Sequence, residues 1–258
     1  MQAVDDGTMN RLVRIGRIGR ARRALRRLGP TGFLRLCAYN LRLLASGRAR
    51  EHAFVYDDAW DRRHGLDTAG MVDVAEIAAP DALKEGAVRY EPTPPDCFAF
   101  LIAAAGIEDA GAWTLVDLGS GKGRVPLLAA MAGFGRSIGV ELGSDLHAIA
   151  CANLIRFRAR QALGPVEFVQ KDARSFGWPD GRTTCFLNNP FSGDILDEVL
   201  NAIEASLAAA PRAFRIVYYH SNHLDRIDRR PAWIPVQRGN WRDASHHYAI
   251  WRWAGTPA

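Results

Sequence analysis

The sequence lacks the features that mark membrane-spanning, secreted and metal-binding proteins. No uninterrupted apolar run approaches the ~20 residues that cross a bilayer, and the first residues lack the charged and apolar order of a secretory signal. The four cysteines lie far apart, without a CxxC motif or a Cys/His pair at metal-ligand spacing, at Cys37, Cys97, Cys151 and Cys185. We therefore expect a cytoplasmic protein with reduced cysteines, no transmembrane segment and no metal site.

Acidic residues are absent from one long stretch near the start of the chain. Residues 10–50 contain 12 arginines and no acidic residue, so the other 21 of the 33 basic residues face all 28 acidic ones. Apolar residues recur there every three or four positions, which predicts an Arg-rich amphipathic helical extension over residues 1–50, at Leu12, Ile15, Ile18, Ala21, Leu25 and Leu28. This extension could dock on nucleic acid or a membrane surface, hold an acidic partner, or pack its apolar stripe on the domain.

The best organised stretch is WTLVDLGSGKGR, from Trp113 to Arg124. Residues 114–118 form a short apolar run of strand type, glycines follow at 119, 121 and 123, and the apolar run VPLLAAMA then indicates a helix. Alternating glycines permit positive φ and close approach of a ligand to the backbone, while a helix start offers free N–H groups. The stretch predicts a strand, a glycine turn and a helix that bind a nucleotide-like ligand.

Polar residues follow three later apolar runs at the points where strands are expected to end. The run from Ser137 ends in Glu141, whose carboxylate can accept both hydroxyls of a ribose. The run VEFVQ leads to Lys171 and Asp172, and the run TTCFL leads to the sequence NNPF at residues 188–191. Because ligands bind at the carboxyl ends of the strands in an open parallel sheet, these turns should converge on one crevice.

These motifs resemble the class I, seven-strand S-adenosylmethionine (SAM) dependent methyltransferases. VDLGSGKGR is similar to their first motif, GVELG to the second, QKDAR to the third and LNNPF to the fourth, over about residues 88 to 253. The resemblance implies an α/β fold with a doubly wound, mostly parallel seven-stranded sheet and an antiparallel last strand. A dehydrogenase-like dinucleotide site stays open as an alternative, whereas a Walker phosphate loop is excluded because Lys122 precedes Gly123 rather than Ser or Thr.

The resemblance also implies roles for individual residues. The residues expected at the cofactor are Tyr90, Glu91, Thr93, Asp117, Gly119, Ser120, Gly121, Gly123, Glu141, Leu142, Asp172, Ala173 and Asn188. Among them, Asp172 would bind the adenine amino group and Ala173 would pass along the base. The residues expected to act in methyl transfer are Asn188, Asn189, Pro190 and Phe191, together with His220. His220 ends a fifth predicted strand, FRIVYYH from Phe214, and could accept a proton or be structural.

The segment before the core, residues 51–90, is expected to be a loop-rich entry or lid, followed by the methyltransferase domain at residues 91–258. Its DRRHGLDTAG sequence, from Asp61, has no periodicity, so it is either a linker or a segment like those that precede the core in similar bacterial proteins. Further on, Tyr90, Glu91 and Thr93 resemble loosely the loop that closes over SAM in non-SET histone lysine methyltransferases. Thr93 is also expected to cap a helix from about Asp96 to Ala105.

The sequence thus predicts a SAM-dependent N-methyltransferase that transfers the methyl group in line to an amine nitrogen. The entry loop and the NNPF sequence favour a protein lysine as the acceptor. Two alternatives stay open. One is a small-molecule methyltransferase, and the other is a module that docks on nucleic acid or membrane through its arginines and carries a regulatory SAM site.

Overall fold

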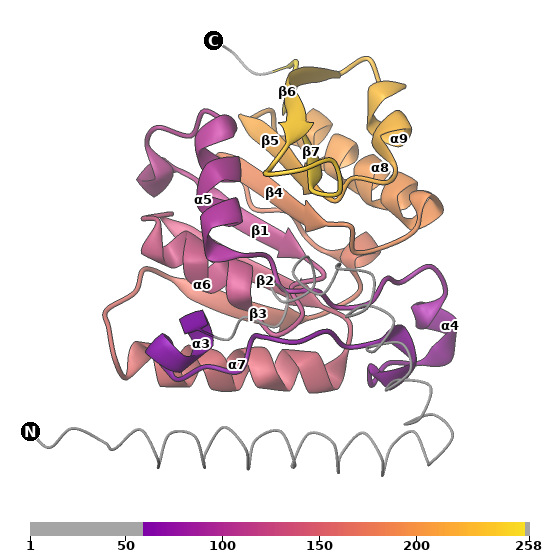
Figure 1. Cartoon of the computed structure of the whole chain (residues 1–258). Helices are drawn as coiled ribbons and strands as arrows, with labels where there is room; N and C mark the ends of the chain where they lie inside the picture. The colour runs from indigo at the N-terminus through magenta and orange to yellow at the C-terminus, as the bar shows by residue number, and fades with distance from the viewer. Residues whose placement is uncertain (1–58, 256–258) are drawn as a thin grey trace, which may run out of the picture. The chain divides into compact units, whose positions relative to one another are not determined.

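The computed structural model describes residues 59–255, which belong to one compact unit. The predicted Arg-rich helix lies outside the described residues. Seven strands form one sheet in the order β3-β2-β1-β4-β5-β7-β6 (Figure 1). Their bounds are β1 Thr114–Leu118, β2 Arg136–Glu141, β3 Val166–Gln170, β4 Thr183–Asn188, β5 Phe214–Tyr219, β6 Trp233–Asn240 and β7 His247–Trp253.

The sheet has the predicted direction of its strands. The pairs β1–β2, β2–β3, β1–β4 and β4–β5 are parallel, and β7 lies antiparallel between β5 and β6. The order reverses at β1, because β2 and β3 follow on one side of it and β4 and β5 on the other. Ligands of open α/β sheets bind at such a switch point, outside the carboxyl ends of the strands.

Helices cover both faces of the sheet, as the doubly wound fold requires. They are α3 Ala59–His64, α4 Asp81–Lys84, α5 Pro95–Ala104, α6 Arg124–Met131, α7 Ser144–Arg158, α8 Gly193–Ala209 and α9 Leu224–Asp228. On one face, Leu196 and Leu200 of α8 join the core cluster of Val116 and Leu187. A second cluster joins α6, α7 and β3. The centres of β1, β2, β4, β5 and β7 are buried, which explains their largely apolar sequences, whereas β3 and β6 at the edges of the sheet are mostly half-buried or exposed.

The helix α5 begins earlier than expected, and the prediction that Thr93 caps it is wrong. Pro95 is the first helical residue and Pro94 takes the N-cap position without a side-chain cap. Thr93 therefore lies one residue too far from the helix for its hydroxyl to reach the first free N–H groups. The hydroxyl instead accepts a hydrogen bond from Nδ2 of Asn188 at 3.2 Å.

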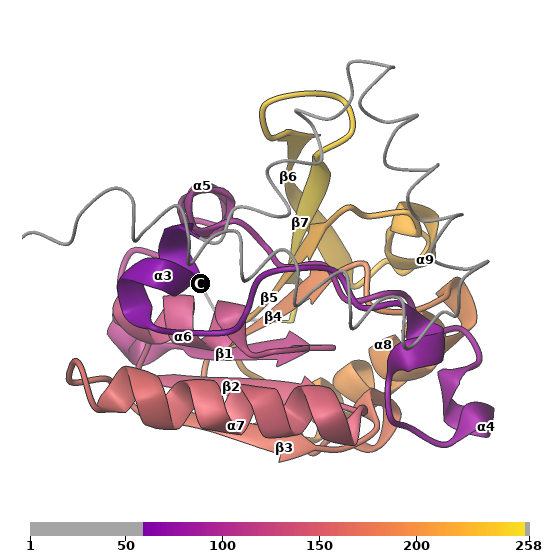
Figure 2. The ribbon, with the colours of Figure 1, turned by 60° about the horizontal axis from the view of Figure 1, so that its bottom comes forward.

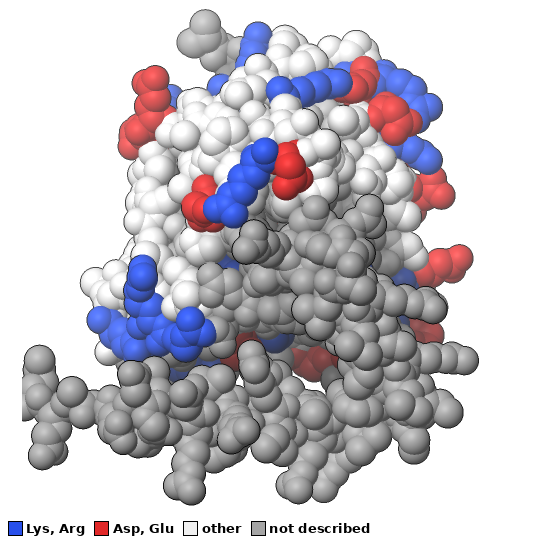
Figure 3. All heavy atoms as spheres, in the orientation of Figure 1, with Lys and Arg blue, Asp and Glu red and all other residues white. Residues whose placement is uncertain are grey.

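The described surface carries charges of both signs, with basic side chains gathered over α3 (Figure 3). Burial and then the nearby charges of Arg63 and Arg160 lower the pKa of His64. Within residues 59–255, no helix is long and apolar enough to cross a membrane, and no group of His, Cys, Asp and Glu could hold a metal ion.

Candidate functional site

A cavity opens at the carboxyl ends of β1, β2 and β4, where the sequence predicted a crevice. It encloses about 880 Å³ of space between atoms, counting its open mouth. Ten of its 23 lining residues precede the first strand: Val74, Ile77, Ala79, Leu83, Lys84, Ala87, Val88, Arg89, Tyr90 and Glu91. The segment that carries them, with α4, lies beyond the arrowhead of β1 (Figure 2). Residues 74–91, which we call the cover segment, therefore form one wall of the cavity.

The glycine turn after β1 has the predicted left-handed backbone. The φ angles of Gly119, Gly121 and Gly123 are +72°, +53° and +87°. A Cβ added to Gly119 would lie 2.7 Å from Cβ of Pro190, and one added to Gly121 would lie 2.0 Å from the ring of Tyr90. The turn thus needs glycine both for its conformation and for the close approach of two cavity-lining residues.

Glu141, the last residue of β2, joins this turn to the cavity. Its Oε2 accepts a hydrogen bond from the Gly121 N–H at 2.7 Å, and Oε1 accepts one from the Gly143 N–H at 2.8 Å. Burial raises the pKa of Glu141, and these two N–H groups oppose the shift. The Leu142 N–H also stabilises the carboxylate. Because a carboxylate can accept about four hydrogen bonds, Glu141 keeps acceptor capacity for a hydroxyl group of a ligand in the cavity.

Asp117 lies deeper than predicted. Only 4% of its surface is exposed, and it is not among the cavity-lining residues. Burial, followed by the charge of Glu141, raises its pKa well above the usual range for an aspartate.

A second polar edge of the cavity follows β3. Asp172 and Ala173 line it, together with Lys171 and Arg174. The Asp172 carboxylate accepts hydrogen bonds from the backbone N–H of Arg174 at 2.9 Å and from its guanidinium at 2.6 Å. The Arg174 hydrogen bonds hold the pKa of Asp172 below its usual value. Both oxygens of Asp172 are thus engaged, which leaves fewer acceptor positions for an adenine amino group than the sequence suggested.

Asn188, the last residue of β4, is held in one orientation. Its Nδ2 donates to the carbonyl oxygen of Glu91 at 2.9 Å and to the hydroxyl of Thr93. Because a carbonyl oxygen can only accept, the NH₂ group of the amide must face residues 91–93. The side-chain oxygen of this cavity-lining residue is therefore presented as an acceptor.

The NNPF loop is tied to the cover segment by backbone hydrogen bonds. The Val88 N–H donates to the Pro190 carbonyl at 3.1 Å, and Ala87 forms an antiparallel bridge with Phe191. Pro190 and Phe191 line the cavity, whereas Asn189 does not. Asn189 has a φ of +44°, and its side-chain oxygen accepts a hydrogen bond from the Tyr218 hydroxyl at 3.2 Å.

His220 lies outside the cavity lining, in a cluster of rings. Its ring stacks on that of Tyr219 with centroids 4.0 Å apart, and the His246 ring lies 5.6 Å away. Burial, followed by the charges of His246 and His247, lowers the pKa of His220 to about 4. The side chain is therefore neutral at pH 7, and its role as a proton acceptor stays a prediction.

This shifted pKa predicts acid sensitivity. The unfolded state binds a proton at His220 near pH 6.5 and the folded state only near pH 4, so acidification through this window favours unfolding, by up to about 3 kcal/mol. His220→Asn should remove this loss of stability, because asparagine has no group that titrates between pH 4 and pH 7. Asparagine also tolerates the positive φ of +50° at this position. Urea unfolding of both proteins from pH 7 to pH 4 measures the effect. If the free energy of unfolding changes with pH by the same amount in the wild type and in His220→Asn, the prediction is wrong.

Ten of the predicted site residues line the cavity: Tyr90, Glu91, Gly119, Glu141, Leu142, Asp172, Ala173, Asn188, Pro190 and Phe191. The others lie outside its lining within the described part of the chain: Thr93, Asp117, Ser120, Gly121, Gly123, Asn189 and His220. The sequence did not indicate the apolar and basic residues of the cover segment, such as Val74, Ile77 and Arg89, or Arg174. Lys171 was expected at the crevice but without a role. The only sequence signal among them was the position of Arg174, two residues after Asp172.

The chain resembles solved structures only distantly. No protein-family model and no curated protein matches it. An RNA methyltransferase from Salinibacter ruber, in complex with S-adenosyl-L-homocysteine, is 21% identical over 65% of this chain and 95% of its own, with a TM-score of 0.44. A magnesium protoporphyrin IX methyltransferase from Synechocystis, with bound SAM, is 14% identical over 61% of this chain and 75% of its own, with a TM-score of 0.43. Similarities at this level do not identify the ligand or substrate of this chain.

Proposed function

We propose that the cavity binds SAM and that the protein is a SAM-dependent methyltransferase acting on a nitrogen acceptor. The observation that carries the proposal is the position of Glu141. A buried carboxylate ends β2, is hydrogen-bonded to the glycine turn, and keeps acceptor positions on the cavity side. The same cavity offers the Asp172–Ala173 edge for a base and the Asn188 amide for an acceptor group.

The glycine turn and the cover segment fit a cofactor of this kind. No Cβ separates the Gly119 backbone from the cavity, and the cover segment forms one wall of it. Bound SAM would supply a methyl group on a positively charged sulfonium. The contribution of the chain is to position the acceptor in line with it and to exclude water, and such orientation can lower a barrier by ~7–11 kcal/mol.

The acceptor side of the cavity suits a nitrogen that carries N–H bonds. The Asn188 side-chain oxygen is available to accept one of them, since the NH₂ end of the amide is bound to residues 91–93. Apolar side chains that line the same cavity, Val88, Phe191 and Ile195, disfavour a charged amine. This matters for a lysine acceptor, because a lysine in water has a pKa of ~10.4 and its deprotonation at pH 7 costs about 4.6 kcal/mol. We therefore keep a protein lysine as the proposed acceptor.

The proposed reaction can be tested by transfer of radiolabelled methyl from SAM into a cell lysate, followed by protease digestion, nuclease digestion and acid hydrolysis of separate samples. Label that is released by protease and elutes as methyl-lysine supports the lysine acceptor. Label that is nuclease-sensitive or in small molecules overturns the lysine acceptor and retains the methyltransferase. Absence of label from every fraction, over a set of lysates, contradicts the proposed activity.

Asn188→Ala should lower kcat more than it weakens SAM binding. The substitution removes the oriented amide oxygen from the acceptor side, and a polar group placed at the reacting centre typically contributes on the order of 10²-fold to kcat. Asn201→Ala, in α8, is the matched control, because the Asn201 amide is likewise held by a hydrogen bond, accepted from Arg230, but lies outside the cavity lining. Initial rates of label incorporation measure the effect. Equal rates for Asn188→Ala and the control would remove Asn188 from the proposed mechanism.

A further inference from the structure

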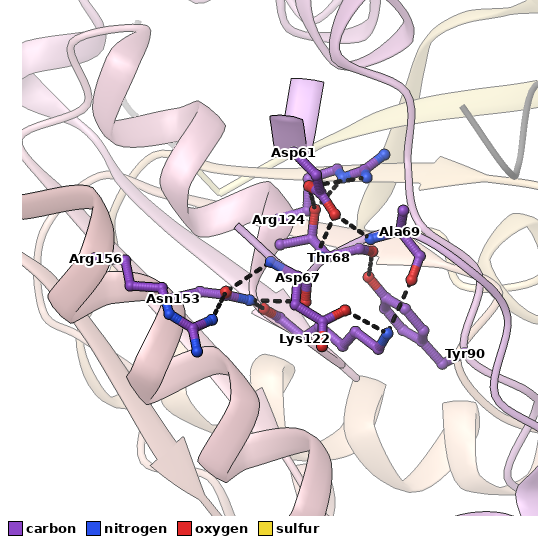
Figure 4. A network of polar contacts seen from close by, with 9 residues as sticks. All are labelled: Asp61, Asp67, Thr68, Ala69, Tyr90, Lys122, Arg124, Asn153 and Arg156. Carbon is purple, nitrogen blue, oxygen red and sulfur yellow. Dashed lines mark hydrogen bonds and ion pairs between the residues drawn. The ribbon is translucent and has the colours of Figure 1, made fainter. Parts of the chain in front are cut away.

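The DRRHGLDTAG sequence is not a linker. Its first residues are helical, in α3, and both Asp61 and Thr68 are buried, at 5% and 0% exposure. We propose that this clamp segment, residues 61–70, is a positioning element that holds Tyr90 on the glycine turn and thereby sets the affinity for the cofactor (Figure 4). The inference rests on the proposed function and assigns a task to a segment outside the cavity.

The first part of the clamp segment is a turn closed by Asp61. Its Oδ2 accepts hydrogen bonds from the backbone N–H groups of Thr68 and Ala69, both at 2.6 Å, and Oδ1 accepts one from the Thr68 hydroxyl at 2.5 Å. One buried carboxylate thus accepts three hydrogen bonds within its own segment. These three bonds fix the shape of residues 61–69.

The second part is a buried ion pair with the start of α6. Arg124 follows the glycine turn directly, and its Nε donates to the Thr68 hydroxyl at 2.6 Å while Nη2 lies 3.4 Å from Oδ1 of Asp61. The two charged side chains are only 5% and 6% exposed, and the guanidinium also lies over the ring of Trp60 at 5.4 Å. Loss of either partner would leave an uncompensated buried charge, so the pair ties the clamp firmly to α6.

The third part reaches the cavity through Tyr90. The Tyr90 hydroxyl donates to the Thr68 carbonyl at 2.6 Å, and its ring fills the space above Gly121. Burial raises the pKa of Tyr90, so the hydroxyl stays protonated and remains a donor. Since Tyr90 lines the cavity, the clamp segment positions one wall of the proposed cofactor site.

Two further residues fasten the clamp to the glycine turn and to α7. Nζ of Lys122 donates to the Ala69 carbonyl at 2.8 Å and lies 3.1 Å from Oδ1 of Asp67. The side chain of Asn153 bonds to both the N–H and the carbonyl of Asp67, each at 2.9 Å, and to the Lys122 carbonyl at 3.0 Å. The lysine and arginine of the GKGR sequence therefore serve the clamp segment, which accounts for their presence in a turn that is not a Walker loop.

The decisive variant is Tyr90→Phe, which keeps the ring against Gly121 and removes only the bond to the clamp. We expect SAM affinity to fall about three- to tenfold, because a free ring must be ordered when the ligand binds. Tyr248→Phe is the matched control, since Tyr248 is also buried and its hydroxyl accepts a hydrogen bond from Gln237, but it lies in β7 outside the cavity lining. Calorimetric titration with SAM measures both.

A second variant tests the clamp itself at Thr68, whose hydroxyl links Asp61 to Arg124. Thr68→Val removes the hydroxyl at nearly constant volume and should weaken SAM binding about tenfold. Thr68→Ser restores the hydroxyl and should recover the affinity. A positioning role also predicts that KM for SAM rises while kcat stays within about twofold, which a general loss of folded protein would not produce.

The double variant Thr68→Val with Tyr90→Phe tests whether Thr68 affects SAM affinity through Tyr90 or independently of it. If Thr68 acts through Tyr90, the double variant binds SAM little worse than Thr68→Val alone. If Thr68→Val and Tyr90→Phe both bind SAM as tightly as the control Tyr248→Phe, the proposed role of the clamp segment is wrong, while the proposed function is unaffected. Failure of the folded wild-type chain to bind SAM would overturn the proposed function, and the clamp's cofactor role with it.

Discussion

Replacing Gly121 with alanine should abolish measurable SAM binding, with a rise in Kd of about 100-fold or more, which corresponds to ~3 kcal/mol. The residue has a φ of +53°, where an L side chain costs ~1–2 kcal/mol. The added Cβ would also lie 2.0 Å from the Tyr90 ring and displace it from the cavity wall. The Gly121 N–H, moreover, is the donor that holds Oε2 of Glu141. Calorimetric titration of SAM into the folded variant measures the loss.

The control for this prediction is Gly133→Ala. Gly133 has a φ of +86°, so the substitution carries the same kind of backbone cost, yet a Cβ there would meet no atom within 4 Å. It should therefore lose stability and bind SAM normally. A Gly121→Ala protein that binds SAM as tightly as Gly133→Ala would show that the contact between Tyr90 and the turn is not part of the ligand site.

Glu141→Gln should weaken SAM binding by about 10²-fold. The glutamate accepts hydrogen bonds from two backbone N–H groups, at Gly121 and Gly143, through its two oxygens. Glutamine has one oxygen, so its NH₂ group must face one of these donors and leave it without a partner. Hydrogen bonds to a charged acceptor contribute ~1.5–3 kcal/mol each, and the hydroxyl groups of a bound ribose would lose their charged acceptor as well.

The matched control is Glu167→Gln, in β3. Glu167 makes an exposed ion pair with Arg136, and such surface pairs contribute ~1 kcal/mol or less. Its substitution should leave both stability and SAM affinity nearly unchanged. If Glu141→Gln behaves like Glu167→Gln in a SAM titration, the ribose acceptor must be another residue and the proposed orientation of the cofactor is wrong.

The sheet could be predicted because the signal for each strand lies in a short stretch of the sequence. TLVDL and TTCFL are short apolar runs, and a strand buried on both faces needs such a run. VEFVQ, which forms the partly buried edge strand β3, is a run of the same length that includes two polar residues. The left-handed turn could be predicted for a similar reason, since glycines at alternate positions have few other uses. Strand order then places the ends of β1, β2 and β4 together.

The cover and clamp segments could not be predicted in this way. They contain little regular structure, so no periodicity reveals which side chains are buried. The Tyr90 hydroxyl bonds to a carbonyl 22 positions earlier, and Arg124 pairs with Asp61 across 63 positions. A buried ion pair looks in sequence like two ordinary surface residues. Asp61 and Arg124 can be told from exposed charges only after the chain has folded.

Thr93 and His220 show a related limit. The sequence indicates that a threonine before two prolines can cap a helix, but the cap position depends on which proline starts the helix. The position of His220 at a strand end predicts a side chain near the crevice. In the structure its φ is positive and its ring stacks on that of Tyr219, in a packed cluster of rings. Backbone conformation at a single residue decides both cases.

The most direct test of the cofactor site is a set of calorimetric titrations of the full chain with SAM, with S-adenosylhomocysteine and with NAD⁺. The carboxylate of Glu141, the Gly121 turn and the Asn188 amide around one cavity predict that SAM and its demethylated product each bind at one site per chain and compete with each other. NAD⁺ should give no competing heat. Binding of NAD⁺ in place of SAM, or no binding of SAM and S-adenosylhomocysteine to the folded protein, would contradict this account.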